Sequence, residues 1–381
     1  MLNPALATTM FWLSLACLAF TFAGYLPLMA VAARLRRRSN WSGSISLQPS
    51  VSVVICAHNE ADRIARRVGN LLASDWPPDR LDILIVSDGS TDATAEIVRQ
   101  FQNPRVSVLE LPQRRGKPAA LNAGVAAATG DIVVLGDTRQ EFAPDAIAKL
   151  VRHFADPAVG AVSGALFIQG ADSAVGGGVD AYWRMEKAIR AAEARWDSCI
   201  GCTGAVYAIR RALFRPIPED TLIDDVVIPM QIALRGHRVL FDPEARAFDP
   251  QTLEPERERI RKRRTLAGNF QMLFRYPGWL LPWRNRLWWQ LIAHKYLRLA
   301  APFLLALLFA SNAALRDEPL YRALFIGQCG FYLAALLGLA LPRLRLVSLP
   351  AAFVFLNWMT LAGLWHYLRG TRQPGWQAAK S

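Results

Sequence analysis

Cysteine is scarce in this sequence. Five of the 381 residues are cysteines, and they are scattered over positions 17, 56, 199, 202 and 329. Such scatter provides no disulfide framework of the kind that holds small secreted domains together. Cys199 and Cys202 do form a CxxC pair, which also occurs in zinc half-sites and redox centres. Those sites need a second pair or a thioredoxin-like context, so we expect this pair to be structural.

Acidic residues are fewer than basic ones. The chain has 31 aspartates and glutamates against 44 lysines and arginines, a net charge of +13. A surplus of this sign is one feature of nucleic-acid-binding proteins. Much of the surplus, however, lies beside long apolar runs, where lysine and arginine meet anionic lipid headgroups. We therefore expect membrane lipids as partners and no nucleic acid.

Four long runs lack charged residues altogether. They cover residues 10–33, 299–315, 323–341 and 346–368, each close to the roughly 20 residues that cross a bilayer. A signal peptide is the alternative for the first run, but there the basic cluster precedes the apolar run, and here it follows. We predict four membrane spans. For the last run a re-entrant segment is the alternative. A fourth crossing would place the basic C-terminal tail outside, against the rule that basic flanks stay inside.

The apolar runs divide the chain into five parts. We predict an N-terminal transmembrane helix with its basic flank (1–38), an α/β domain (39–275), interfacial amphipathic helices (276–297), about three C-terminal transmembrane helices (298–369) and a tail (370–381). Because basic flanks stay inside, the domain is expected to be cytoplasmic. The expected location is the inner (plasma) membrane, crossed several times.

Residues 51–135 alternate between strand and helix patterns. Strand patterns cover residues 51–56, 81–86, 106–111 and 132–135, and helix patterns cover residues 61–73, 93–101 and 119–128, with Ser90 or Thr91 as the expected cap of the second helix. Such alternation predicts an α/β fold with a Rossmann-like, mostly parallel sheet covered by helices on both faces. Ligands bind these sheets where the strands end at their carboxyl edge.

Polar residues follow four consecutive strand ends. They are Glu60 after the first strand, Asp88 at the end of the second, Gly116 and Lys117 after the third, and Asp137 at the end of the fourth. The alternative is that they only cap helices and solvate turns, which is the interpretation that we prefer for Asp92 and Asp131. Taken together, the four positions favour one shared binding site.

Three further segments carry polar residues. "GCTGAVYAIRR" is a glycine-containing loop before a strand, and "LIDDVVIPMQIALRG" places Asp224 and Asp225 at the start of a helix. The acid pair alternatively serves only the helix dipole. "EPERERIRKRRTLAGNFQMLF" is a basic helix, alternatively an electrostatic membrane anchor, although anchoring does not exclude a catalytic arginine.

A single acid, a lysine, an acid pair and a late arginine suit a polyanionic substrate such as a nucleoside diphosphate-sugar. Mg²⁺ and Mn²⁺ commonly keep water and phosphate oxygens as ligands, so a bound diphosphate needs few protein carboxylates beside the metal. Asp137 therefore needs no second acid. Arg139, two residues later, is then either a second countercharge or a surface cation.

Five segments carry a family resemblance. In order they are "VSVVICAHNE", "VSDGSTD", "RGKPAALNAG", "VLGD" and "DD…ALRGHRVLF". They resemble the inverting family 2 glycosyltransferases of GT-A fold, in the membrane branch that contains cellulose, hyaluronan and poly-N-acetylglucosamine synthases and ceramide glucosyltransferases. The resemblance covers roughly residues 49–274 and the flanking spans. It implies a hexosyltransferase that uses a UDP-sugar, Mg²⁺ or Mn²⁺, and a lipid or growing polysaccharide as acceptor, with an export subunit as a potential partner.

The resemblance also implies roles for the matching residues. As catalytic residues it implies Asp225 as general base, Asp224 beside it and Arg264 facing the diphosphate. The implied nucleotide-binding residues are Ala57, Asn59, Glu60, Asp88, Gly116, Lys117 and Asp137, of which Asp137 also holds the metal. The implied acceptor-binding residues are Cys202, Thr203, Gly204 and Arg261.

Three positions depart from the family pattern. Arg139 replaces the second acid of the DxD motif, Ile223 replaces a threonine before the acid pair, and Thr265 replaces a tryptophan associated with polymer binding. The last change favours single transfer to a lipid over processive synthesis. Arg139 is the best support for an alternative of another class, a non-catalytic membrane assembly subunit with a degenerate transferase domain.

Overall fold

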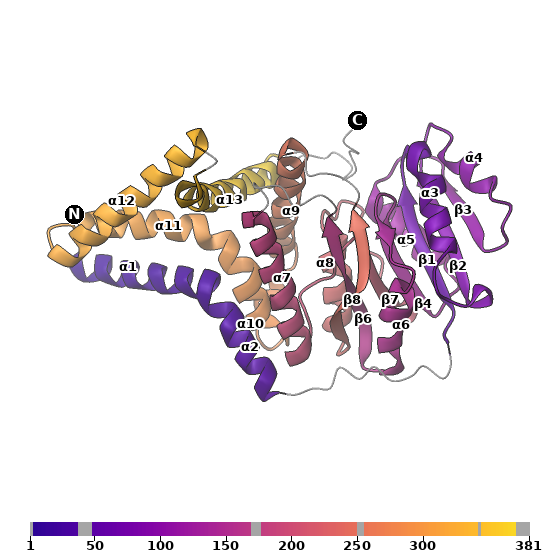
Figure 1. Ribbon diagram of the computed structural model, residues 1–381. Helices are drawn as coiled ribbons and strands as arrows, with labels where there is room; N and C mark the ends of the chain where they lie inside the picture. The colour runs from indigo at the N-terminus through magenta and orange to yellow at the C-terminus, as the bar shows by residue number, and fades with distance from the viewer. Residues whose placement is uncertain (1–2, 37–47, 169–176, 250–254, 342–343, 371–381) are drawn as a thin grey trace.

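The computed structural model describes residues 3–36, 48–168, 177–249, 255–341 and 344–370. The sequence-based expectations for residues 37–38, for the basic position 343 and for the tail beyond residue 370 lie outside these ranges. Figure 1 shows an α/β domain built around one sheet, with a group of long helices on one side of it. The polypeptide therefore separates into a sheet-containing part and a helical part.

The sheet has eight strands in the order β3-β2-β1-β4-β7-β6-β8-β5. Their bounds are β1 Val51–Ala57, β2 Leu81–Asp88, β3 Val106–Leu111, β4 Ile132–Asp137, β5 Glu141–Phe142, β6 Val159–Ile168, β7 Val206–Arg210 and β8 Arg238–Asp249. Strands β3, β2, β1 and β4 run parallel, as do β6 and β8, whereas β7 and β5 pair antiparallel with their neighbours. The prediction of a mostly parallel α/β sheet is confirmed.

The α/β domain holds seven α-helices in the described residues. They are α3 Ala61–Leu72, α4 Thr94–Arg99, α5 Lys117–Ala127, α6 Ala146–Val151, α7 Gly177–Trp196, α8 Asp224–Ala233 and α9 Pro255–Arg275. Every residue of β1 is buried, because helices and neighbouring strands enclose it. The continuous apolar run of residues 51–56 is thus the signature of a central parallel strand.

The expected helix cap at Ser90 or Thr91 is wrong. Helix α4 begins later, at Thr94, and Asp92 lies two residues before its first amide. Asp92 Oδ1 accepts a hydrogen bond from Thr94 N (3.1 Å), and Asp92 Oδ2 accepts one from Ala61 N (3.1 Å) at the start of α3. One carboxylate therefore satisfies free amides of two helix N-termini, so the turn interpretation of Asp92 holds.

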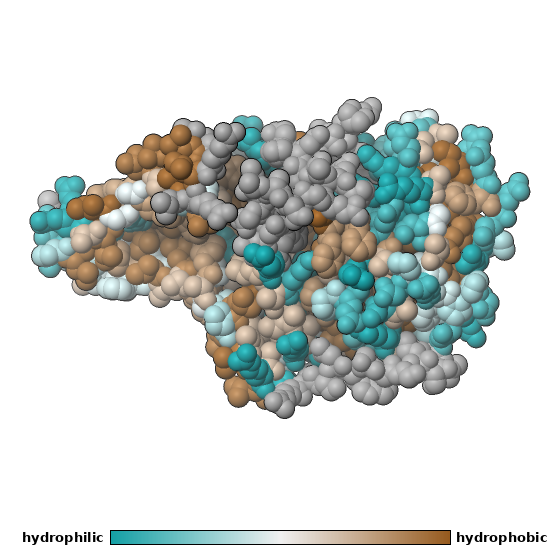
Figure 2. Space-filling model, in the orientation of Figure 1, coloured by the Kyte–Doolittle hydropathy of each residue, from teal (hydrophilic) through white to brown (hydrophobic). Residues whose placement is uncertain are grey.

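Within the described residues, four helical segments are long and apolar enough to cross a membrane. They are Pro4–Leu35, Trp288–Ala314, Pro319–Gly338 and Val347–Leu368, as the four charge-free runs predicted. The first joins α1 (Pro4–Ala19) and α2 (Tyr25–Leu35) through a π-helical turn, η1 (Phe20–Gly24). Figure 2 shows hydrophobic residues gathered over this helical part, while the α/β domain presents a largely hydrophilic face.

The predicted interfacial segment, residues 276–297, is not a separate unit. After a short 3-10 helix, η5 (Pro277–Leu280), the chain forms one continuous helix of α10 (Trp288–Gln290), η6 (Leu291–Tyr296) and α11 (Leu297–Ala314). Arg286 of this segment binds Asp197 at 2.9 Å and the His237 carbonyl at 2.6 Å. Arg286 therefore anchors this segment to the α/β domain.

The last two apolar segments lie in α12 (Pro319–Ala340) and α13 (Arg345–Leu368). They link the other spans to α9. Helix α1 packs along α11, α12 packs along α13, and α13 packs along α9. Gly363 of α13 permits this last contact, because a Cβ there would lie 2.6 Å from the Leu266 side chain. Helix α9 thus lies between a membrane span and the rest of the α/β domain.

Helix α5 packs on the sheet through Gly124, which generates a stability prediction. A Cβ at Gly124 would lie 2.5 Å from Val54 Cγ1 and 2.8 Å from Val86 Cγ2. We expect Gly124→Ala to overpack this contact and to cost about 1–3 kcal/mol, lowering the melting temperature of the detergent-solubilised protein.

The matched control is Gly69→Ala in α3, where a Cβ meets nothing within 4 Å. It should be neutral or raise the melting temperature, since alanine favours a helix interior by about 1 kcal/mol over glycine. Equal melting temperatures for the two variants would contradict the packing.

Candidate active site

Two carboxylates lie at the same edge of the sheet, on either side of β1. In the strand register Cys56 pairs with Asp137 of β4, and Ala57 pairs with Ser87, the residue before Asp88. Because the three strands are parallel, their carboxyl ends open toward one side. The predicted site residues Asp88 and Asp137 therefore share one edge, with the fully buried Ala57 between them.

Asp88 fixes the start of helix α5. Its Oδ1 accepts a hydrogen bond from Arg115 N and its Oδ2 one from Gly116 N, both at 2.8 Å. Gly116 has φ = 98°, a conformation that residues with a side chain adopt only with strain. Together the carboxylate and the glycine direct the chain into α5 so that Lys117 begins the helix at the sheet edge.

Lys117 lies between two carboxylates from distant parts of the chain. Its Nζ is 2.8 Å from Asp137 Oδ1 and 3.5 Å from Asp224 Oδ2, and its side chain is 14% exposed. Burial lowers the pKa of this ammonium, but Asp137 and Asp224 outweigh burial and raise the pKa. For Asp137, burial raises the pKa, and the ion pair with Lys117 more than reverses this, so the pKa is lowered. Both partners are charged at neutral pH.

Asp225 is a buried carboxylate with a raised pKa. Burial and the neighbouring Asp224 raise the pKa of Asp225 to about 6, against the opposing effect of Lys117 and Arg190. A carboxylate with such a pKa is ionised at neutral pH, yet it is a stronger base than an ordinary aspartate. Asp225 thus has the property required of a general base.

The loop of residues 201–204 wraps around Asp225. Cys202 N donates to the Asp225 carbonyl (2.7 Å), and a Cβ at Gly204 would lie 3.0 Å from Asp225 Oδ2. The glycine at position 204 therefore lets the loop approach the carboxylate. The Cys202 side chain is only 1% exposed and belongs to the core, so Cys202 contributes its backbone to this site. The neighbouring Thr203 is partly exposed.

The turn after β1 is held by the turn after β2. Asn59 adopts φ = 54°, and its Oδ1 accepts a hydrogen bond from Thr91 N (2.8 Å). The Glu60 backbone amide donates to Thr94 Oγ1 (2.9 Å). Burial raises the pKa of the Glu60 carboxyl, and the nearby Arg63 partly opposes this rise. Asn59 and Glu60 thus lie at the same sheet edge as Asp88.

Helix α9 brings two predicted arginines to this side of the domain. Gly268 permits α9 to contact Ile223, since a Cβ at Gly268 would lie 2.6 Å from Ile223 Cγ2. The helix is thereby packed directly before the Asp224–Asp225 pair. Arg264 is close enough for its charge to lower the pKa of Asp137. Arg261, one turn earlier, is half-buried, and its carbonyl accepts a hydrogen bond from Thr265 Oγ1 (3.1 Å).

Arg139 forms an ion pair within the α/β domain. Its Nη2 lies 2.6 Å from Asp249 Oδ2, and the Asp249 side chain is 4% exposed. Gln140 Nε2 also donates to this oxygen (3.1 Å). The charge of Arg139 nevertheless reaches the site, because it contributes to the lowered pKa of Asp137. The residue at the second DxD position thus connects β4 to β8.

Comparison with known proteins identifies the domain. Residues 52–217 match the model of glycosyl transferase family 2. They form a family 2 glycosyltransferase domain. A mannosyltransferase from Pyrobaculum calidifontis, solved in complex with GDP-Man and Mn²⁺, aligns with 95% of this chain and 100% of its own, with a TM-score of 0.71 and 24% sequence identity. The chain thus has the GT-A fold that the resemblance implied.

Curated relatives are similar to about half of this chain. Poly-beta-1,6-N-acetyl-D-glucosamine synthase of Staphylococcus aureus is 28% identical over 224 residues, which are 53% of this chain and 51% of that protein. An N-acetylglucosaminyltransferase of Rhizobium meliloti is 30% identical over 226 residues, which are 54% of this chain and 53% of that protein. The chain spans about half the length of the curated relatives it matches.

The glycosyltransferase domain offers one carboxylate for a divalent metal at the sheet edge. Among the described residues there is no group of three or more histidine, cysteine or acidic side chains that could hold a metal. Asp137 is 35% exposed, so it has room for a ligand besides Lys117. A single partly exposed carboxylate fits Mg²⁺ or Mn²⁺ when phosphate oxygens and water supply the other ligands.

Sequence patterns missed one residue that the structure brings to the candidate site, Arg190 of α7. Its Nη1 donates to Thr203 Oγ1 (2.7 Å), and its charge lowers the pKa of Asp225. The only sequence signal is the spacing of Glu186 and Arg190, which are four residues apart and form an ion pair at 3.7 Å. This spacing is common on exposed helices, so it did not mark a functional residue.

The ion triad of Lys117, Asp137 and Asp224 yields a pH-dependent prediction. Lys117→Met leaves two neighbouring carboxylates without their cation, so we expect the melting temperature to fall by several degrees at pH 8. The loss should be smaller at pH 5. Without Lys117, burial and mutual repulsion raise the carboxyl pKa values, and protonation then removes the uncompensated charge.

Thermal unfolding of the detergent-solubilised protein at pH 5 and pH 8 measures this effect. The matched control is Lys149→Met, whose ion pair with Glu244 has a 58% exposed carboxylate and should contribute about 0–1 kcal/mol. A loss in the Lys117 variant that is equal at both pH values would contradict the triad.

Proposed function

We propose that the protein is a membrane-embedded, inverting glycosyltransferase that moves a sugar from a UDP-sugar to a hydroxyl of a lipid or a growing polysaccharide. The observation that carries this proposal is the contact of Lys117 with both Asp137 and Asp224, beside the basic carboxylate Asp225. Three segments of the chain thus supply an acid for a metal, a cation for a diphosphate and a base for an acceptor. The names of the synthase relatives support the same class of reaction.

Asp225 acts as the general base. It removes the proton from the acceptor hydroxyl while that oxygen attacks the anomeric carbon from the face opposite the diphosphate, so a single displacement inverts the anomeric configuration. Positioned proton transfer of this kind contributes typically about 10²- to 10⁴-fold to the rate. Asp224 keeps the pKa of Asp225 high, and it also faces Lys117.

Lys117 and Arg264 stabilise the negative charge that develops on the leaving diphosphate. Charges fixed in place before the reaction need little reorganisation, so this electrostatic contribution is usually the largest one. Asp137 would hold the metal, Mg²⁺ or Mn²⁺, and the relative solved with Mn²⁺ supports a divalent ion. When bound, such an ion adds positive charge at the leaving group. Ala57, Asn59, Glu60, Asp88 and Gly116 form the nucleotide-binding edge.

The acceptor approaches past residues 203 and 204, next to Asp225, with Arg261 of α9 on the same side. The basic flank at the end of the first span, which begins with Arg34 and Arg36, supports a cytoplasmic catalytic domain. A plasma-membrane enzyme in this orientation can receive a cytoplasmic UDP-sugar and pass its product into the bilayer or to an export subunit. Packing of α9 on the span α13 brings the acceptor side close to the membrane.

The deciding experiment incubates the full-length protein in membranes with radiolabelled donors and sizes the products. The donors should include UDP-N-acetylglucosamine and GDP-mannose, after the names of the relatives. Asp225→Asn is expected to lower transfer by about 10²-fold or more, while binding of UDP persists. The control is Asp131→Asn at the opposite end of β4, whose side chain accepts a hydrogen bond from Ser50 Oγ (2.8 Å); this variant should keep full activity.

Each outcome of that experiment has one meaning. Transfer that survives in Asp225→Asn would remove this residue from the mechanism. No transfer by the unaltered protein from any donor, with UDP still bound, would favour the assembly-subunit alternative. A singly glycosylated lipid as product would exclude polymer synthesis, and a ladder of long products would exclude single transfer.

The pKa of Asp225 predicts the acid limb of the pH profile. A base must be unprotonated, so kcat/KM should fall about tenfold per pH unit below about pH 6 and level off above it, in line with the pKa of about 6. The ionisable groups that face Asp225 are Asp224, Lys117, Arg190, Asp137, Cys202 and Tyr207. Initial rates between pH 4.5 and pH 8 measure this limb, and a profile without a limb above pH 5 would contradict it.

A further inference from the structure

A buried polar cluster joins two membrane spans to helix α7. Glu193 of α7 accepts a hydrogen bond from Tyr25 Oη (2.6 Å), and His294 Nδ1 lies 2.9 Å from the same oxygen, Oε1. Glu193 and His294 are completely buried, and Tyr25 is 1% exposed. Two residues from different spans thus converge on one carboxylate of the catalytic domain.

Both spans depart from regular helix geometry at this cluster. The π-helical turn η1 ends directly before Tyr25, and His294 lies inside the π-helical turn η6. Short π-helical turns are rare and frequently occur at functional sites. The inserted residue changes the direction of the side chains that follow it, so it can aim Tyr25 and His294 at α7. Polar groups in membrane spans are costly and usually have a function.

The cluster continues along α7 to Glu186. His294 Nε2 lies 3.0 Å from Glu186 Oε1, and Arg298 Nη1 lies 3.0 Å from Glu186 Oε2. Glu186 is 5% exposed. His294 therefore bridges two carboxylates that are two helical turns apart, and the span that carries it fixes the position of α7.

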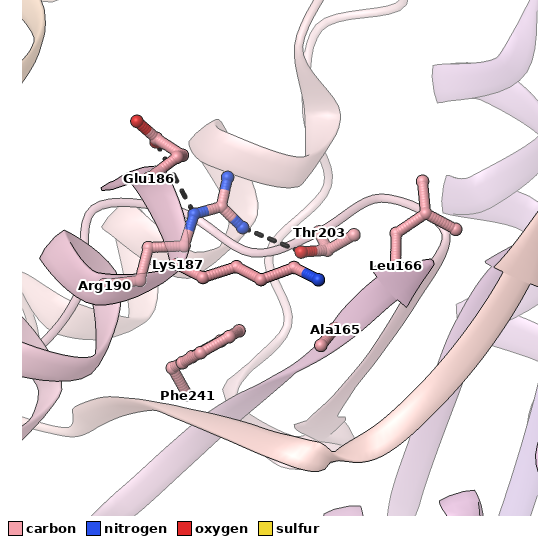
Figure 3. Close-up of a pocket in the computed structure, with 7 residues that line it drawn as sticks. All are labelled: Ala165, Leu166, Glu186, Lys187, Arg190, Thr203 and Phe241. Atoms are coloured by element: carbon pink, nitrogen blue, oxygen red, sulfur yellow. Dashed lines mark hydrogen bonds and ion pairs between the residues drawn. The ribbon is translucent and has the colours of Figure 1, made fainter. Parts of the chain in front are cut away.

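Arg190 extends the chain of contacts to the active site. Figure 3 shows its guanidinium between Glu186 and Thr203, in a pocket that is closed on one side by Phe241. Arg190 Nε lies 3.7 Å from Glu186 Oε1, and Arg190 Nη1 donates to Thr203 Oγ1 (2.7 Å). Thr203 precedes Gly204, which contacts Asp225. These contacts thus connect Tyr25 and His294 in the spans with the loop beside Asp225.

We propose that Arg190 is a positioning residue that transmits the placement of the membrane spans to the acceptor side of the active site. This inference rests on the proposed function. Arg190 is held by Glu186 at one end of its guanidinium and holds the loop of Thr203 and Gly204 at the other. Because the guanidinium is planar and forked, it fixes the relative position of both partners.

The contact between Arg190 and the loop should affect the alignment of the acceptor with Asp225 more than the binding of the donor. The loop of Thr203 and Gly204 lies against Asp225, so its displacement moves the acceptor hydroxyl relative to the base. A misplacement of about 1 Å can lower a rate by about 10²-fold. The donor site at Lys117 and Asp137 is formed by other elements, α5 and β4, so donor binding should not change.

The experiment compares full-length variants in nanodiscs by steady-state kinetics with the donor and the acceptor varied separately. Arg190→Met is expected to lower kcat by about 10- to 100-fold with an unchanged donor KM. Arg190→Lys keeps one donor for Thr203 and should recover part of kcat. Arg195→Met, an exposed arginine on the same helix, is the matched control and should match the unaltered protein.

Tyr25→Phe tests the membrane end of the path without touching the active site. It removes one hydroxyl, so we expect a smaller fall in kcat, about 3- to 10-fold, equivalent to a coupling of about 0.6–1.4 kcal/mol. In the Arg190→Met background it should cause no further fall, because both changes break the same path. Tyr321→Phe, which removes a hydroxyl bonded to Trp12 Nε1 in the spans, is the control and should leave kcat unchanged.

The outcomes separate this inference from the proposed function. No transfer by the unaltered protein contradicts the proposed function itself. Transfer by the unaltered protein with normal kcat in Arg190→Met overturns the inference. Additive losses for Tyr25→Phe and Arg190→Met also overturn it. If Arg190→Met fails to fold, Arg190→Lys and Tyr25→Phe decide whether the inference holds. A lower melting temperature with unchanged kcat in both of these variants means that the cluster is only structural.

Discussion

The site depends on one buried cation held between two carboxylates. Lys117 contacts Asp137 at the end of a sheet strand and Asp224 at the start of a helix about 90 residues later in the chain. Acids brought this close without a cation repel each other and shift toward their neutral forms. With Lys117 between them, Asp137 and Lys117 both remain charged. The sheet edge therefore offers positive and negative groups together, as a metal-bound diphosphate requires.

The pKa of Asp225 follows from the same arrangement. Its neighbour Asp224 is only partly neutralised by Lys117 at 3.5 Å, and the remaining negative charge, added to the effect of burial, raises the pKa of Asp225. Arg190 limits that rise from the other side. Two adjacent acids in the sequence thus have different surroundings: Asp224 faces Lys117, whereas Asp225 faces the loop of Thr203 and Gly204.

The candidate membrane helices pack against helices that border the candidate site. Helix α13 packs along α9, which carries Arg261 and Arg264, and the spans that carry Tyr25 and His294 bind α7. Two catalytic-domain helices therefore each contact membrane spans and the site. Arg286 illustrates why this was hard to foresee, since a basic residue beside an apolar run suits lipid headgroups equally well. Here it binds Asp197 of the α/β domain.

The sequence determined the strand and helix order of residues 51–135, the strand Val106–Leu111 to the residue, the four apolar spans and the acids and lysine at the sheet edge. These features are local, because periodicity and strand-end position are properties of short segments. The tertiary structure decided the partners: Arg139 with Asp249, Arg190 with Thr203, and His294 with Glu193, which is 101 residues away. Pairings over such separations follow from how whole helices pack, and no pattern within a segment records them.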